Sequence, residues 1–382
     1  MLKLNKNCTK EKKLNKYGFM QGIIALMVSQ ILIKILGLAY KWYLTNKEGF
    51  GDKGNAIYSA GFSIYALLLT LSSTGVPNAV SKLVSSYVAK GDYRGAHRVF
   101  KIAFVTFALI GLAGTLCLFF GANYIANVML VIPEAQLSIV ALSPAVFFVS
   151  IISVFRGYFN GRQDMKATAN SQTIEQLFKT ILTILLVEVV AIISKVNTNI
   201  MVAGANLATT LATITSFTYL YIFYKKRSQE LAREIVISRN YGTKSIFKTV
   251  KNILLISIPM SLSSILASIN RNIDLTTVKR GLENFLTEGE ALKQYGILSG
   301  KVDTLTTLPL SFNIALATAL VPAITACKTK GDMQTVKKRI SFSLLITMLI
   351  GLPCMLGMFV FARTNFKFTL SKCFRGNVYI AN

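Results

Sequence analysis

The run IAFVTFALIGLAGTLCLFFG, residues 102–121, contains no charged residue and decides the class of fold. A helix needs about 20 apolar residues to cross about 30 Å of hydrocarbon. Similar runs recur along the 382-residue chain, which is 53% hydrophobic and only 15% charged. A soluble protein of this size would carry more charge and would not string together such long uncharged runs. The sequence therefore predicts an all-α, polytopic membrane protein.

The chain is expected to cross the membrane nine times. The predicted spans lie at residues 19–43, 57–80, 99–121, 136–158, 170–194, 200–224, 250–271, 302–326 and 340–362. The first ends in the aromatic stretch Tyr40-Lys-Trp-Tyr43, so it is interpreted as a spanning helix and not as a cleaved signal. Six of the seven prolines fall within the spans, where neighbouring helices can satisfy the freed carbonyl groups. Kinked helices of this kind favour a transporter over a simple anchor.

Lysine and arginine are distributed unevenly between alternate loops. The segments on the side of the N-terminus carry 27 of them, and the opposite segments before the C-terminal tail carry 9. Positive residues concentrate in cytoplasmic loops, so the N-terminus is predicted to be cytoplasmic, in a bacterial plasma membrane. The net charge of +26 is then mostly a basic face that meets anionic membrane lipids, and we expect no nucleic-acid partner.

The spans divide the chain into segments. We expect a cytoplasmic N-terminus (1–18), a first lobe of six helices (19–224), a cytoplasmic linker (225–249), three helices of a second lobe (250–362) and a tail (363–382). An internal repeat supports the lobes: TGVPNAVS at 74–81 is followed by Lys90-Gly-Asp, and ALVPAIT at 319–325 by Lys330-Gly-Asp. A shift of six spans keeps both copies on one side of the membrane, as a parallel repeat requires.

The tail departs from this pattern. Residues 363–382 carry four basic residues and no acidic residue, on the side expected to be outside. We therefore expect an atypical tail that arises from a frameshift or truncation near residue 362.

The sequence offers no arrangement of residues for covalent chemistry. His97 is the single histidine, and the five cysteines include no CxxC pair. No Walker loop or nucleophile–base constellation is present. We expect neither enzymatic activity nor a metal or cofactor.

Charged residues within the spans are the candidates for substrate binding, because an ion at mid-bilayer costs several kcal/mol unless it is paired or hydrated. Lys34, near the centre of the first span, faces a cavity or snorkels to the interface. Glu175 and Lys179 share one polar face and form either a self-neutralised structural pair or a substrate contact. Arg271 and Asp274 close the seventh span, as an interfacial pair or as a cavity gate.

Several motifs carry a resemblance when taken together. They include Lys34-Ile-Leu-Gly37, LSSTGVPNAVSK at 71–82, Phe155-Arg-Gly-Tyr-Phe-Asn-Gly161 and Leu320-Val-Pro-Ala323. In order and spacing they resemble the MurJ/SpoVB/YtgP-type flippases of lipid-linked glycans, within the MOP superfamily that also includes MATE exporters. The motif residues expected to have structural roles are Gly37, Gly75, Pro77, Ser81, Lys82, Arg156, Gly157, Gly161 and Pro322. Arg156 is interpreted mainly as a topology determinant at a cytoplasmic exit.

The resemblance implies a two-lobed bundle with a cationic central cavity. Such a protein moves an undecaprenyl-pyrophosphate-linked cell-wall precursor, such as lipid II, by alternating access, and we expect it to act as a monomer. Lys34 matches the position where related flippases place a basic cavity residue. Two alternatives stay open. One is a MATE-like cation-coupled exporter, which would have a carboxylate-centred cavity in the first lobe. The other is a truncated product that does not transport.

Overall fold

The computed structural model describes residues 25–26, 28–70, 72, 75–130, 132–193, 197–238, 245–285, 287 and 331–360, together with scattered positions between 310 and 329. An unlabelled helix at residues 28–46 comes first. The labelled helices are α2 (Gly51–Thr70), α3 (Val76–Ala89), α4 (Tyr93–Tyr124), η2 (Ile125–Met129), η3 (Pro133–Ala135), α5 (Gln136–Gly161), α6 (Met165–Ile193), α7 (Thr198–Lys226), α8 (Ser228–Val236), α9 (Ile246–Glu283) and α12 (Met333–Val360). Throughout the described part of the chain the regular structure is helical, as predicted.

Six helices in this described part are long and apolar enough to cross a membrane. They match six predicted spans, namely 99–121, 136–158, 170–194, 200–224, 250–271 and 340–362. The first predicted span is covered in part by the helix at 28–46, and the eighth lies mostly outside the described residues. The chain is therefore a multi-pass helical membrane protein.

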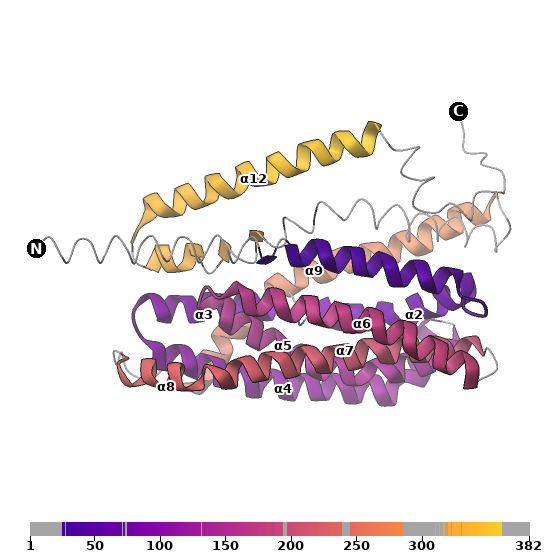
Figure 1. Ribbon diagram of the computed structural model, residues 1–382, viewed down its shortest axis with the longest axis horizontal. Coiled ribbons are helices and arrows are strands. Elements are labelled where there is room, and N and C mark those ends of the chain that lie inside the picture. The colour runs from indigo at the N-terminus through magenta and orange to yellow at the C-terminus, as the bar shows by residue number, and fades with distance from the viewer. Residues whose placement is uncertain are drawn as a thin grey trace, which may run out of the picture.

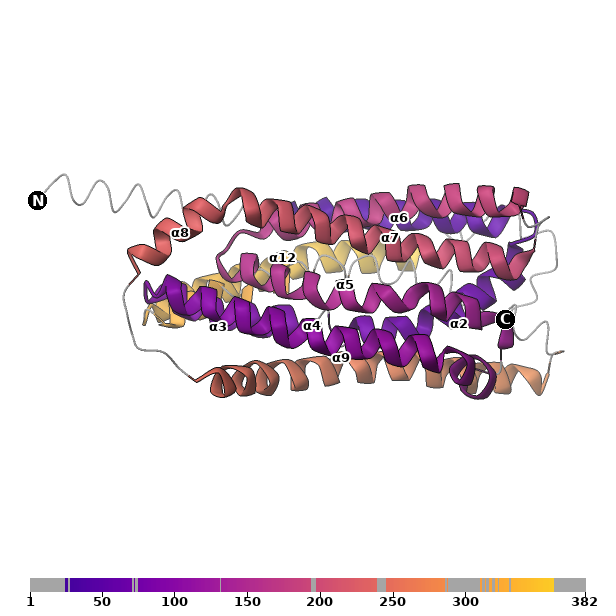
Figure 2. The same ribbon diagram turned by 90° about the horizontal axis from the view of Figure 1, so that it is seen from below.

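The long helices run side by side along the longest axis of the molecule (Figures 1 and 2). The helix α5 lies at the centre of the predicted first lobe and contacts α2, α3, α4, α6 and α7. In the most apolar stretch of each helix, 67% of α5 and 61% of α7 are buried, whereas 0% of α12 is buried. The packed core is thus built around α5 and α7. The helix α12 is set apart from the other labelled helices (Figure 1), and many of its apolar side chains are exposed.

Two labelled helices cover the second predicted span. The helix α2 ends at Thr70, and α3 begins at Val76 with Pro77 in its first turn. Between them Ser72 and Gly75 have π-helical backbone, and residues 71, 73 and 74 lie outside the described residues. One continuous span at 57–80 stays a prediction, and α3 runs on beyond it to Ala89.

The internal repeat is confirmed at the level of the backbone. Gly91 and Gly331 both have positive φ, at 79° and 77°, as expected for a glycine that ends a helix. The next residue is an aspartate in each case. The carboxylates of Asp92 and Asp332 accept a hydrogen bond from the backbone N–H three residues further on, at 2.7 Å and 3.0 Å. The same sequence pattern thus ends one helix and caps the next in both places.

Candidate functional site

An ion pair inside the bundle joins α5 to α6. The Nη2 atom of Arg156 donates to Oε2 of Glu175 at 2.6 Å. The same guanidinium donates to the hydroxyl groups of Ser171, at 3.0 Å, and Ser216, at 3.1 Å. The side chains of Arg156 and Glu175 are only 14% and 25% exposed. Both charges are therefore held within one hydrogen-bonded network that links α5, α6 and α7.

This network corrects two predictions. Glu175 does not form the expected self-neutralised pair with Lys179, because Arg156 from α5 supplies its cation. Arg156 is more than a topology determinant, since its side chain points into the bundle and holds a carboxylate. The spacing along one helix could not reveal a partner that lies 19 residues away, across the turn between α5 and α6.

Lys179 occupies an aromatic cage in the first lobe. Lys179 is buried, with only 8% of the residue exposed. The Nζ atom lies 4.6 Å from the ring centroid of Phe62 and 5.4 Å from that of Tyr40. Ring faces attract a cation, most strongly where water is excluded, so these contacts offset part of the cost of burying the ammonium. A contact between Lys179 and the substrate stays a prediction.

The cage leads to a test by substitution. Phe62→Leu is expected to lower stability by about 1–2 kcal/mol, because Lys179 loses its nearest ring face. The comparison is Phe120→Leu on α4, where the ring is 78% exposed and the change should stay within about 0.5 kcal/mol. Thermal unfolding in detergent would measure both. If Phe62→Leu costs as much in a Lys179→Met background as in the wild type, the ring does not act through the ammonium.

The helix at 28–46 packs against the polar face of α6. Nε2 of Gln30 donates to Oε1 of Gln172 at 3.0 Å, and a Cβ at Gly37 would lie 3.7 Å from Nε2 of Gln176. Both glutamines of α6 therefore face this neighbouring helix. Lys34 is half-buried, and its position, four residues after Gln30 and three before Gly37, lies on the same side of the helix. Whether Lys34 faces a cavity or snorkels stays a prediction.

The glycines of the family motifs allow α3 and α5 to approach closely. A Cβ at Gly157 would lie 2.8 Å from the carbonyl oxygen of Pro77, and a Cβ at Gly161 would lie 2.8 Å from that of Ser81. Small residues spaced in this way let two membrane helices pack backbone against backbone. The predicted structural roles of these four residues agree with this contact, whereas Lys82 is exposed.

The remaining candidates lie on α9 and beyond it. The helix α9 continues from Ile246 to Glu283, so Arg271 and Asp274 lie within the helix. A membrane span can end within a longer helix, so the expectation that these residues close the seventh span stays a prediction. The side chains of both residues, and the whole of Pro322, lie outside the described residues.

Two ion pairs that the sequence did not suggest tie together one end of the bundle. Nη2 of Arg162 lies 2.5 Å from Oε2 of Glu234, which fastens α8 to the end of α5. Arg227 donates to Asp164, which joins the end of α7 to the loop between α5 and α6. Each pair links residues more than sixty positions apart, so no local pattern points to it.

Among the residues that the structure describes, no group of three histidine, cysteine, aspartate or glutamate side chains could hold a metal ion. The charged groups inside the bundle form ion-pair and cation–π contacts. Charges held in such a low-dielectric region can attract a ligand of opposite charge.

Solved structures with the same fold are transporters. An outward-facing MATE family transporter of the MOP superfamily superposes with a TM-score of 0.73 at 16% identity, covering 92% of this chain and 74% of that chain. A MOP superfamily transporter from Pyrococcus furiosus superposes with a TM-score of 0.74 at 16% identity, covering 93% and 74%. Identities this low establish the fold alone.

Curated relatives give closer matches in sequence. Stage V sporulation protein B of Bacillus subtilis (strain 168) is 28% identical over 353 residues, covering 91% of this chain and 66% of the relative. Lipid II flippase MurJ of the same organism is 25% identical over 360 residues, covering 91% and 65%. The chain thus spans about two thirds of the length of these relatives.

The resemblance that the motifs carry is thereby confirmed. The family described as "Polysaccharide biosynthesis protein" matches residues 19–328. The match begins at the first predicted span and extends through the six helices of the predicted first lobe into the second. The chain belongs to the polysaccharide biosynthesis protein family.

Proposed function

We propose that this protein takes part in moving a lipid-linked cell-wall precursor across a bacterial plasma membrane, with its N-terminus in the cytoplasm. The cargo class is a sugar joined to a polyprenyl carrier by pyrophosphate, such as lipid II. The movement is by alternating access and needs no covalent chemistry. The names of the relatives support a flippase role, and the matching transporter folds support movement across the membrane.

The balance of charge within the first lobe is the observation that carries the proposal. Among the residues that the structure describes, Arg156 and Lys179 are largely buried cations of the first lobe, and Glu175 binds Arg156. Lys179, whose ammonium lies against the rings of Phe62 and Tyr40, adds a buried positive charge beyond this ion pair. Charges attract strongly in such a low-dielectric region, so the lobe favours a doubly charged anion such as pyrophosphate.

A MATE-like cation-coupled exporter is the second candidate. The fold match supports it as well as it supports a flippase. That function would need a carboxylate available to a cation in the first lobe. Glu175 is held by Arg156, and Glu188, near the other end of α6, is held by Lys47 at 2.5 Å. The pairing of both carboxylates favours the anionic cargo.

Reconstitution tests the proposal. Liposomes that contain the 382-residue chain and fluorescent lipid II are expected to translocate the lipid faster than protein-free liposomes. Lys34→Ala should slow this movement by about tenfold or more, because a hydrogen bond to a charged group contributes about 1.5–3 kcal/mol. The rate at which an external enzyme modifies the exposed headgroup would measure the movement.

The matched control is Lys101→Ala, which removes an exposed lysine from α4 and should leave the rate unchanged. Equal rates for the chain and for protein-free liposomes would contradict the proposed function. A Lys34→Ala variant as fast as the control would remove only the role of Lys34.

A further inference from the structure

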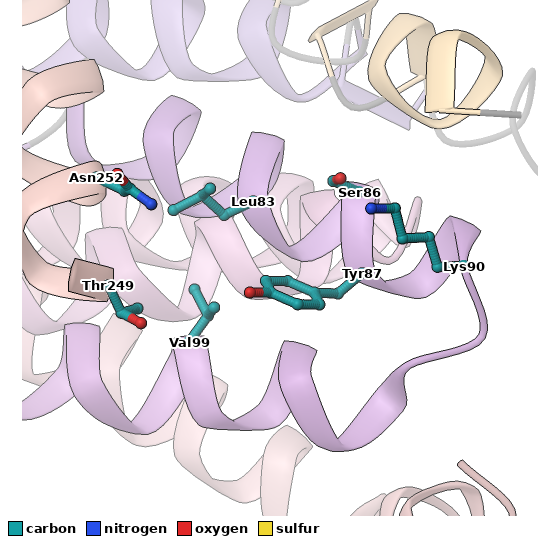
Figure 3. Close-up of a pocket in the computed structure, with 7 residues that line it drawn as sticks. All are labelled: Leu83, Ser86, Tyr87, Lys90, Val99, Thr249 and Asn252. Atoms are coloured by element: carbon teal, nitrogen blue, oxygen red, sulfur yellow. The ribbon is translucent and has the colours of Figure 1, made fainter. Parts of the chain in front are cut away.

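A small cavity lies between α3, α4 and α9, where the predicted first lobe meets the first helix of the second (Figure 3). Its volume is about 70 Å³. A single water molecule needs only about 10–15 Å³ of such space, so the cavity has room for a larger group. It lies at the end of the bundle that carries most of the basic residues, which is the predicted cytoplasmic face.

The polar lining of the cavity consists of hydrogen-bond donors from two helices. They are Ser86, Tyr87 and Lys90 at the end of α3, and Thr249 and Asn252 at the start of α9. The ring of Tyr87 extends from α3 toward α9, with its hydroxyl group on the side of Thr249 (Figure 3). Hydroxyl, amide and ammonium groups can all donate to the oxygens of one anion.

None of the cavity-lining residues that the structure describes is a carboxylate. The acidic residue closest in sequence to Lys90 is Asp92, which is 4% exposed. Its carboxylate caps α4 by accepting from the backbone N–H of Gly95 at 2.7 Å. The charge at the cavity is therefore positive, and the acid beside it is committed to a structural role.

The first turn of α9 adds features that suit a lipid. Ile246 and Phe247, beside Thr249, are 60% and 78% exposed. Lys248 is also exposed, and it lies four residues before Asn252 on the same side of the helix. Apolar side chains next to a basic polar cavity match the two parts of a phospholipid, the acyl chains and the phosphate.

We propose that this cavity binds the phosphate group of an anionic phospholipid whose acyl chains lie along the exposed apolar residues of α9. Lys90 from α3 and Lys248 from α9 flank the phosphate, and Ser86 and Asn252 donate to its oxygens. The lipid then bridges the two predicted lobes at their basic end. This site is separate from Lys34, Arg156 and Lys179, so it does not depend on the identity of the cargo.

Native mass spectrometry of the detergent-purified full chain tests the site. Phosphatidylglycerol is expected to bind more tightly than zwitterionic phosphatidylcholine. The double variant Lys90→Gln/Lys248→Gln should weaken phosphatidylglycerol binding by about tenfold, since each lysine near lipid phosphates contributes about 1 kcal/mol. Asn252→Leu, which removes an amide donor without changing charge, should weaken it by about threefold or more.

The matched control is Lys226→Gln at the end of α7, which removes an exposed lysine from the same end of the bundle. It should change the affinity by less than about twofold, because it lies outside the cavity. Equal losses in the control and in the double lysine variant would overturn the proposal, since the binding would then reflect diffuse charge. It would also be overturned if the double variant lost binding of undecaprenyl phosphate while its binding of phosphatidylglycerol stayed unchanged.

Discussion

Replacing Arg156 with glutamine is expected to lower the free energy of unfolding by about 3 kcal/mol, because Glu175 is left inside the bundle without its cation. Ser171 and Ser216 would lose a charged donor in the same step. Since about 1 kcal/mol shifts the melting temperature of a large domain by roughly 2–4 °C, the melting temperature should fall by several degrees. Scanning fluorimetry of the purified protein in detergent would measure it.

The matched control is Arg227→Gln, which breaks an ion pair at the end of the bundle, where the arginine side chain is 43% exposed. An exposed pair contributes about 0–1 kcal/mol, so this variant should melt close to the wild type. The double variant Arg156→Met/Glu175→Met should recover most of the lost stability, because neither charge is then left unpaired. Equal melting temperatures for Arg156→Gln and Arg227→Gln would contradict the claim that the Arg156–Glu175 ion pair is buried.

Replacing both Gly157 and Gly161 with alanine is expected to cost about 2–6 kcal/mol, since each overpacked site costs about 1–3 kcal/mol. The added Cβ atoms would lie 2.8 Å from backbone carbonyl oxygens of α3, which cannot rotate away as a side chain can. The helices α3 and α5 must then separate along the whole contact. Melting temperature and the yield of folded, monodisperse protein would measure the loss.

Gly357→Ala in α12 is the control, because a Cβ there would meet nothing within 4 Å. It should leave stability unchanged or raise it slightly, as alanine favours a helix by about 0.5–1 kcal/mol over glycine. If the double variant on α5 has the same melting temperature as this control, α3 and α5 do not pack against each other through Gly157 and Gly161.

The fold was predictable where it depends on composition, and less so where it depends on packing. Uncharged runs located the spans, and the Lys-Gly-Asp loops predicted the repeated helix ends, because positive φ and capping are local properties. The π-helical backbone at Ser72 and Gly75, just before Pro77, was not predicted. Backbone hydrogen bonding near a proline in a membrane helix depends on the neighbouring helices, which the sequence does not show.

The candidate site shows the same division. The sequence placed Glu175 and Lys179 on the inward face of α6, which the structure bears out. It paired them with each other, because spacing within one helix is visible in sequence and contact between helices is not. Arg156 and the rings of Tyr40 and Phe62 come from three other segments. Only the packing of the bundle brings them to α6.

Gly75, just before α3, also bears on the alternating access that we propose. A Cβ there would be 2.4 Å from the carbonyl oxygen of Ser257 on α9. No other amino acid could bring the two main chains this near without a shift. Under the proposed alternating access, a rigid rocking of the predicted lobes that preserves this contact would have its axis close to Gly75. Parts of the bundle far from this axis would then move the furthest.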